Sequence, residues 1–368
     1  MERLETTGTD TDGIAPDDTG VFDLHAAYPP RGAGRARYAR SAPLKLTDLF
    51  TTVGAFNNVA NIVMQLSLPP VGHGVNESHV ASGSPRRRPV KRARTTQLYL
   101  TVALMGNEAD RTALREELRQ VHTPVHSTHE SPVKYSANAK DLQLWVAVCL
   151  FRYYIDQYTI LYGSLPVEQL DHLVQEGSVL ATGVNVPQRD WPQTWLQFEQ
   201  YWRDMLPRMA IAQPVRDDFE SLADLTFLAE AWGWRGALLA RMLGRQFHFL
   251  TRATLPPFFR ELMGWDWTAT DQQRFDHILR LIRPIDRVLN PLLIAVLYRL
   301  YLVDYRIRRL IGSTALGPLR LSEMAIKDGG GYRESVRRGV RPPRLRESGA
   351  TTRSDRHKHK QVNWPRLR

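Results

Sequence analysis

Apolar residues recur at helical spacing from about residue 50 to about residue 310, and no segment there alternates apolar and polar residues like a half-buried strand. Residues 57–68 are typical, with an apolar face made of Val59, Ile62, Val63 and Leu66. A chain without strands can bury its apolar side chains only by packing helix against helix. We therefore expect an all-α fold with a single multi-helix domain.

The same periodicity predicts ten further helices, at residues 95–105, 107–122, 141–162, 166–182, 192–206, 216–233, 235–252, 257–264, 271–282 and 291–311. Pro69-Pro70 is expected to end the first helix, and a loop rich in Gly and Ser follows it. The apolar run from Pro291 to Val303 contains Arg299 and is shorter than the ~20 residues that cross a bilayer, so it predicts a buried core helix.

The positive charge of the chain is concentrated near its C-terminal end. Residues 327–368 hold 13 Lys and Arg against four Asp and Glu, a net charge of +9 out of +11 for the whole chain. We expect a disordered lead-in at 1–42, a helical domain at 43–327 and a disordered basic tail at 328–368. Such a tail could make weak contacts with a polyanion or an anionic membrane, but it lacks the interleaved aromatics of a specific nucleic-acid site.

The N-terminal composition and the cysteine usage indicate the compartment. The first 18 residues carry six acidic side chains and no apolar segment, which is unlike a signal peptide. The single cysteine, Cys149, cannot form an internal disulfide. We expect a cytoplasmic protein, with peripheral membrane contact as an alternative and no transmembrane helix.

His122 is the most informative polar residue. Leu114, Leu118 and His122 are spaced by four, so the imidazole lies on the apolar face of the helix at 107–122. The common motifs of hydrolases, kinases, zinc enzymes and dinucleotide-binding folds are absent from the sequence. His122 could be a core histidine, a metal ligand together with His126 and His129, or a single axial ligand. If His122 is not a ligand, His73, His79 and His248 are the next candidates.

Four segments between about residues 50 and 310 resemble the MpaB/rubber-oxygenase family, which includes the latex clearing proteins. They are Val63–Ser78 with its Pro-Pro-Val-Gly-His-Gly-Val step, Arg92-Ala-Arg-Thr-Thr96, Val121-His-Thr-Pro-Val125, and Tyr135-Ser-Ala-Asn138 followed by Leu144-Trp-Val146. Each motif is short, but their order and spacing together are fairly specific.

The resemblance implies a globin-like helical fold that binds haem b, with His122 as the proximal ligand of the iron. It also implies that Arg92 and Thr96 lie close to the haem, and it makes Glu77 a candidate acid–base group. From the residues alone, Arg92 would belong to a solvated basic run and Glu77 to an exposed loop.

The implied activity is a haem-dependent oxygenase acting with O₂ on a small apolar, unsaturated substrate. The sequence departs from the family pattern at Thr95, Ala139, Lys140 and Ala147, where many members carry other residues, including a lysine before the motif threonine. The alternatives are a non-catalytic haem- or lipid-binding protein of the same fold and a binder of polyanions or membrane surfaces through the tail.

Overall fold

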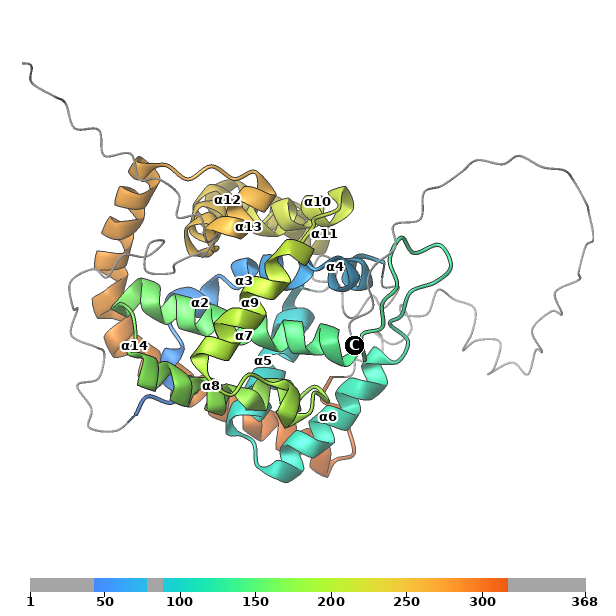
Figure 1. The fold of residues 1–368 in the computed structure, drawn as a ribbon. Coiled ribbons are helices and arrows are strands. Elements are labelled where there is room, and N and C mark those ends of the chain that lie inside the picture. The colour runs from blue at the N-terminus through green and yellow to red at the C-terminus, as the bar shows by residue number, and fades with distance from the viewer. Residues whose placement is uncertain (1–42, 78–88, 317–368) are drawn as a thin grey trace, which may run out of the picture.

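The computed structural model describes residues 43–77 and 89–316 (Figure 1). Within these ranges the regular elements are helices, and the only pairing of strand type is an isolated antiparallel bridge between His126 and Ser136. The all-α prediction is therefore confirmed. The expected lead-in at 1–42, the tail at 328–368 and His79 lie outside the described residues.

The elements follow one another along the chain with short connections. They are the 3₁₀ helix η1 (Leu46–Leu49), α2 (Thr52–Phe56), α3 (Val59–Leu66), α4 (Pro69–Asn76), α5 (Pro89–Met105), α6 (Glu108–His122), α7 (Lys140–Tyr162), α8 (Val167–Thr182), η3 (Gln188–Asp190), α9 (Trp195–Met205), η4 (Leu206–Arg208), α10 (Gln213–Ala223), α11 (Phe227–Trp232), α12 (Trp234–Thr254), α13 (Pro257–Met263) and α14 (Ala269–Leu310).

Helix α7 forms the centre of the fold. Nearly all of its residues are buried, as expected of a helix that is apolar on every side. Helices α3, α8, α12 and α14 pack around it. The fully buried Trp145 stacks on Trp202 of α9 and donates its indole N–H to the carbonyl of Gln65 in α3, at 3.1 Å. This packing fixes α3, and with it the start of α4, relative to the core.

The prediction of a loop after Pro69-Pro70 was wrong, because α4 begins there. Pro69 and Pro70 occupy the first positions of the helix, where the missing N–H has no partner to lose and the fixed φ suits the helix. Gly72 permits the tight turn from α3, since a Cβ there would lie 2.4 Å from the carbonyl oxygen of Leu66. The segment that the sequence predicts to be a loop is therefore a helix, and it holds His73 and Glu77 one turn apart.

The predicted helix at 216–233 is two helices in the structure. Helix α10 ends at Ala223 and α11 begins at Phe227, with Leu225 between them at φ +66. The next corner, at Gly233, has φ +59 and turns α11 into α12. A left-handed residue cannot continue a right-handed helix, so the chain changes direction at both points.

Helix α14 also differs from the prediction. It runs unbroken through Pro284 and Pro291, where two separate helices were expected. The segment Pro291–Val303 is not a buried core helix, because Leu292, Val296, Leu300 and Val303 are more than half exposed. The sequence shows that the segment is apolar, but not which of its faces the neighbouring helices cover.

The inner face of α14 is joined to the rest of the domain. Tyr305 donates to the carbonyl of Asp110, Asn290 to that of Phe50, and Arg283 to that of Leu161. By length and composition alone, α14 is the one helix among the described residues that could cross a membrane, and 19% of its most apolar window is buried.

Candidate functional site

His122 is the last residue of α6, as the sequence predicts. The helix begins with a capping box in which Asn107 and Asp110 each accept a hydrogen bond from the backbone of the other. Leu114 is buried and Leu118 packs against the core, so the face that also carries His122 turns inward. The imidazole itself is partly buried, and its Nδ1 is enclosed without a hydrogen-bond partner.

The surroundings of His122 favour a neutral ring. Burial lowers its pKa to about 4, and the positive charge of Arg92 contributes in the same direction. At neutral pH the imidazole is therefore uncharged, which is the form that binds a metal. A buried nitrogen without a partner costs stability, and such sites are often retained for function.

Arg92 lies on α5 and is near enough to His122 to affect its titration. Its side chain is exposed by surface area, yet the surrounding protein lowers its pKa by desolvation. Both observations fit a guanidinium with protein on several sides and one edge open to solvent. Within the described residues we find no carboxylate paired with it, so its charge and its donors are free for an anionic group.

Thr96 lies one turn after Arg92 on the same helix. The two are spaced by four, so they share a face of α5. Thr96 is partly buried, and the next turn of this face continues into the buried Leu100 and Ala103. Thr95 points elsewhere and donates its hydroxyl to the carbonyl of Arg92 at 3.1 Å. Arg92 thus lies near His122, and Thr96 shares the face of α5 that carries Arg92.

Glu77 caps the C-terminal end of α4 and holds three donors. Its Oε2 accepts hydrogen bonds from Ser131 Oγ at 2.6 Å and Tyr135 Oη at 3.0 Å, and its Oε1 lies 2.8 Å from His73 Nδ1. Burial acts to raise the pKa of Glu77, but the hydrogen bonds and the proximity of His73 outweigh it and lower the pKa. Glu77 is therefore an ionised anchor for the loop that follows α6.

From the residues alone, Glu77 was expected in an exposed loop. The structure instead places it at the end of α4, with three hydrogen-bonding partners. Sequence reasoning missed His73, Ser131 and Tyr135 as its partners. The i, i+4 spacing of His73 and Glu77 was visible, but it carries meaning only on a helix, and this segment was expected to be a loop. No hydrogen bond or ion pair of the described residues joins this cluster to Arg92 or His122.

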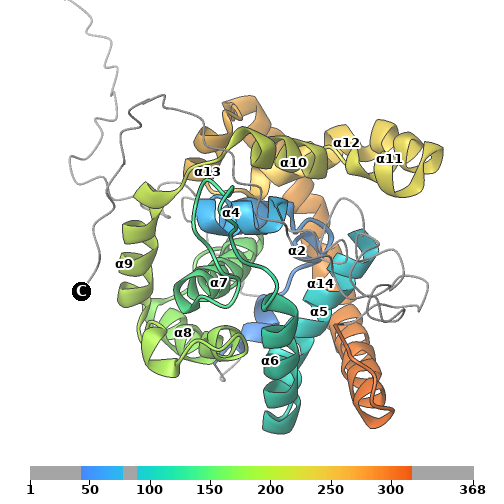
Figure 2. The ribbon, with the colours of Figure 1, turned by 90° about the vertical axis from the view of Figure 1, so that its right-hand side faces the viewer.

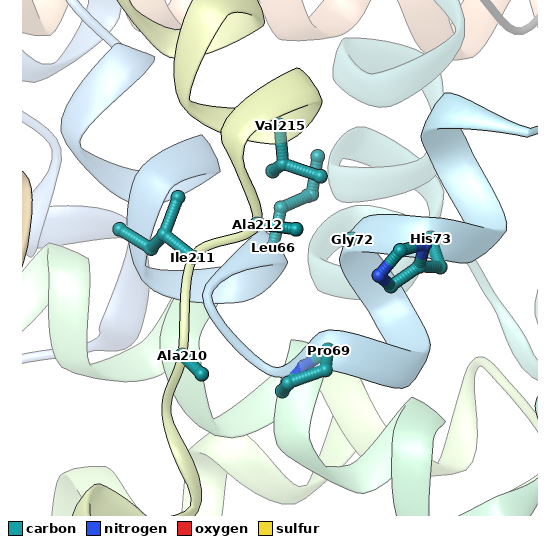
Figure 3. Close-up of a pocket in the computed structure, with 8 residues that line it drawn as sticks. All are labelled: Leu66, Pro69, Gly72, His73, Ala210, Ile211, Ala212 and Val215. Atoms are coloured by element: carbon teal, nitrogen blue, oxygen red, sulfur yellow. The ribbon is translucent and has the colours of Figure 1, made fainter. Parts of the chain in front are cut away.

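A cavity of about 270 Å³ lies beside His73 (Figure 3). Its lining is apolar except for the imidazole and comes from α3, α4, α10 and the segment that precedes α10. The lining residues are Leu66, Pro69, Gly72, His73, Ala210, Ile211, Ala212 and Val215. Because Nδ1 of His73 is held by Glu77, Nε2 is the ring nitrogen left for a ligand. The cavity could hold a small apolar molecule.

The other histidines named as possible ligands occupy different surroundings. His126 and His129 are exposed, and His129 lies near Glu130. His248 lies edge-on to Trp265 and 3.5 Å from Glu220. Among residues 43–77 and 89–316, no three His, Cys, Asp or Glu side chains gather where they could share a metal ion. A shared site with His126 and His129 therefore finds no support there.

Comparison with known proteins gives the family. Residues 49–284 match the family described as "ER-bound oxygenase mpaB/B'/Rubber oxygenase, catalytic domain". Two uncharacterized proteins, one of Mycobacterium bovis and one of Mycobacterium tuberculosis, are each 40% identical to this chain over 249 residues, covering 68% of this chain and 95% of the relative. No solved structure matches the chain significantly. The match spans more than half of the chain, and the chain belongs to the mpaB/rubber-oxygenase catalytic-domain family.

Proposed function

We propose that the protein is a haem b-dependent oxygenase that acts on a small apolar, unsaturated substrate and that His122 is the axial ligand of the haem iron. Membership of an oxygenase family supports the general activity. The observation that carries the proposal is the state of His122, which a lowered pKa keeps neutral at pH 7 and which lies near Arg92, a guanidinium without a carboxylate partner among the described residues.

These residues fit a haem better than a metal ion held by protein side chains alone. A haem brings four nitrogen ligands of its own, so one neutral imidazole is enough to attach it. Its propionates are anions, and Arg92 offers a guanidinium without a carboxylate partner among the described residues. A bound haem would supply the redox chemistry with dioxygen that no side chain of this chain provides.

Each residue then has a separate task. His122 would hold the iron, Arg92 would pair with a propionate, and Thr96 would contribute a hydroxyl from the same face of α5. Glu77, fixed in ionised form by three donors, would hold the loop that leaves His122 rather than exchange protons readily.

A non-catalytic haem protein of the same fold is the second candidate, and two observations favour it. Glu77 has a lowered pKa, which makes it a weaker base than a free glutamate. Two of the positions where the sequence departs from the family pattern offer no ligand, since Ala147 is buried in α7 and Thr95 donates its hydroxyl to the carbonyl of Arg92.

Haem titration and oxygen uptake test the proposal together. The full chain should develop a Soret band with one equivalent of haem, and His122→Ala should lose most of it while keeping its helix content. His126→Ala and His129→Ala are the matched controls and should bind haem like the wild type, because both side chains are exposed. Normal haem binding by His122→Ala would refute the assignment.

Oxygen uptake then separates the two candidates. The haem-loaded protein should consume O₂ when an unsaturated lipid is added, and a saturated lipid of equal length is the control. A normal Soret band with no uptake from a panel of olefins would favour the non-catalytic haem protein over the oxygenase.

A further inference from the structure

The outer sides of α11, α12 and α14 carry a large apolar surface that no described residue covers. It consists of Trp232, Trp234, Leu238 and Met242 on α11 and α12, and of Leu292, Val296, Leu300, Val303 and Ile307 on α14, with exposed fractions from 39% to 73%. We refer to these residues as the α12–α14 face. In Figure 2, α11 and α12 lie at the upper right of the molecule and the C-terminal part of α14 at the lower right. Single exposed apolar residues need no explanation, but rows of them along one side of a helix, as on α12 and on α14, indicate a binding surface.

The exposed apolar residues of α14 form a face that is distinct from the one packed against the core. They are spaced by three and four, so they form one face along the helix. The opposite face is already committed to the domain, where Tyr298 and Tyr305 are buried and Asp110 binds Arg306 and Arg309. Among the described residues nothing covers the exposed face, so a partner can reach it there.

The exposed charges next to this face are mostly positive, with Glu230 on α11 as the exposed acidic residue beside Trp232. Helix α12 has no acidic residue, and Arg235, Arg241 and Arg245 are exposed on it. On α14, Arg280 and Arg299 are exposed. The acidic residues of α14 after Asp276 face elsewhere or are paired, since Asp286 is buried and Asp304 binds Arg94 and Arg308.

Exposed arginines on the same helices as the apolar residues favour some partners over others. In a two-fold dimer formed through this face, the same patch would meet itself and arginines would lie against arginines. An anionic phospholipid surface offers the complementary arrangement, with phosphates for the arginines and acyl chains for the apolar residues. The chain beyond α14 adds a net charge of +9 over residues 327–368, which would increase attraction to the same surface.

The corner between α11 and α12 has the residues of a membrane interface. Trp232 and Trp234 flank Gly233, whose φ of +59 makes the turn, and the two indoles are 45% and 73% exposed. Tryptophan is enriched where hydrocarbon meets headgroups, because its ring is apolar and its N–H needs a polar partner.

We propose that the α12–α14 face inserts into the interfacial region of an anionic phospholipid bilayer, between the headgroups and the acyl chains, with the Trp232–Trp234 corner at the level of the headgroups. The helices lie along the membrane rather than across it, because the inner face of α14 stays bonded to the domain. This docking is independent of the haem proposal and uses a different surface.

A site-specific dye tests the proposal on the full chain. Cys149 is fully buried and burial raises its pKa, so it should not react, and Trp234→Cys and Leu300→Cys each provide one reactive thiol. Leu196→Cys on α9 is the matched control, because Leu196 is 72% exposed and α9 lies at the left of Figure 2, opposite α11, α12 and α14. With phosphatidylcholine/phosphatidylglycerol vesicles, an environment-sensitive dye at 234 and at 300 should shift to the blue and be quenched by spin-labelled lipid, while the dye at 196 should not change.

Vesicle binding in which the dye at 234 or the dye at 300 stays in water would overturn the proposal, because the basic tail alone would then account for the binding. In co-sedimentation, the double variant Trp232→Ala/Trp234→Ala should partition at least about tenfold less into these vesicles, and Leu196→Gln should match the wild type. If the wild type ignores lipid but forms a dimer that the double variant cannot form, the face is a self-association surface and the proposal is wrong.

Discussion

Replacing His122 with leucine should stabilise the protein in the absence of haem. The enclosed Nδ1 has no hydrogen-bond partner, and a buried polar atom in that condition costs about 1–3 kcal/mol. Leucine removes the atom and suits a face that already carries Leu114 and Leu118. We expect His122→Leu to be more stable than the wild type by up to this amount at pH 7, although it should lose haem.

The difference should grow as the pH falls. The pKa of His122 is lowered from 6.5 to about 4 in the folded protein, so the unfolded chain takes up a proton near pH 6.5 that the folded protein takes up only near pH 4. The wild type therefore loses stability as the pH falls from 6.5 to 4, by at most about 3 kcal/mol. Because the ring is only partly buried, solvent reduces this value. His122→Leu lacks this contribution.

Urea unfolding of both proteins at about pH 7 and about pH 5 measures the effect. The advantage of His122→Leu should rise by up to about 2 kcal/mol over this interval. Other groups titrate in the same range, notably Asp156, whose pKa burial raises to about 6, but they are common to both proteins and cancel in the comparison. A constant difference between the two proteins would show that His122 is not held neutral by the fold, and the reasoning would be refuted.

Three further perturbations test other parts of the structure. Glu77→Gln should leave its three donors poorly satisfied and lower the free energy of unfolding by about 1–3 kcal/mol, as measured in urea; no loss would show that the cluster does not hold the loop after α6. Gly236→Ala places a Cβ 1.8 Å from the carbonyl oxygen of Leu228 and should lower the melting temperature by several degrees, whereas an unchanged value would contradict the close packing of α11 on α12. Asp110→Ala removes the partner of two α14 arginines and should raise amide exchange at the C-terminal end of α14; unaltered protection would mean that these ion pairs do not hold the helix.

The position of His122 could be predicted because local rules agree along α6. A capping box starts the helix, the leucines mark its inner face, and His122 falls on that face at its last turn. The proximity of Arg92 could not be read from the same pattern. Arg92 belongs to a basic run, and only the packing of α5 against α6 brings it near the imidazole.

The errors in the predicted fold share a cause. Proline occurs both at the ends of helices and within them, and an apolar run can be either buried or exposed. Pro69-Pro70 ends one helix and begins the next, so α4 and its His73–Glu77 pair were missed. Pro284 and Pro291 lie within α14, whose turns are held by contacts of Asn290 and Arg283 with the domain. The apolar residues of α14 lie on both of its faces, so burial depended on tertiary contacts that periodicity does not contain.

Chemical rescue of a His122→Gly variant tests the central claim most directly. Removing the side chain should abolish the Soret spectrum of the wild-type complex, and free imidazole should restore it by filling the vacated position and binding the iron. A matched His126→Gly variant should keep the wild-type spectrum without added imidazole, because His126 is exposed. A His122→Gly variant that binds haem with the wild-type spectrum before imidazole is added would contradict the account.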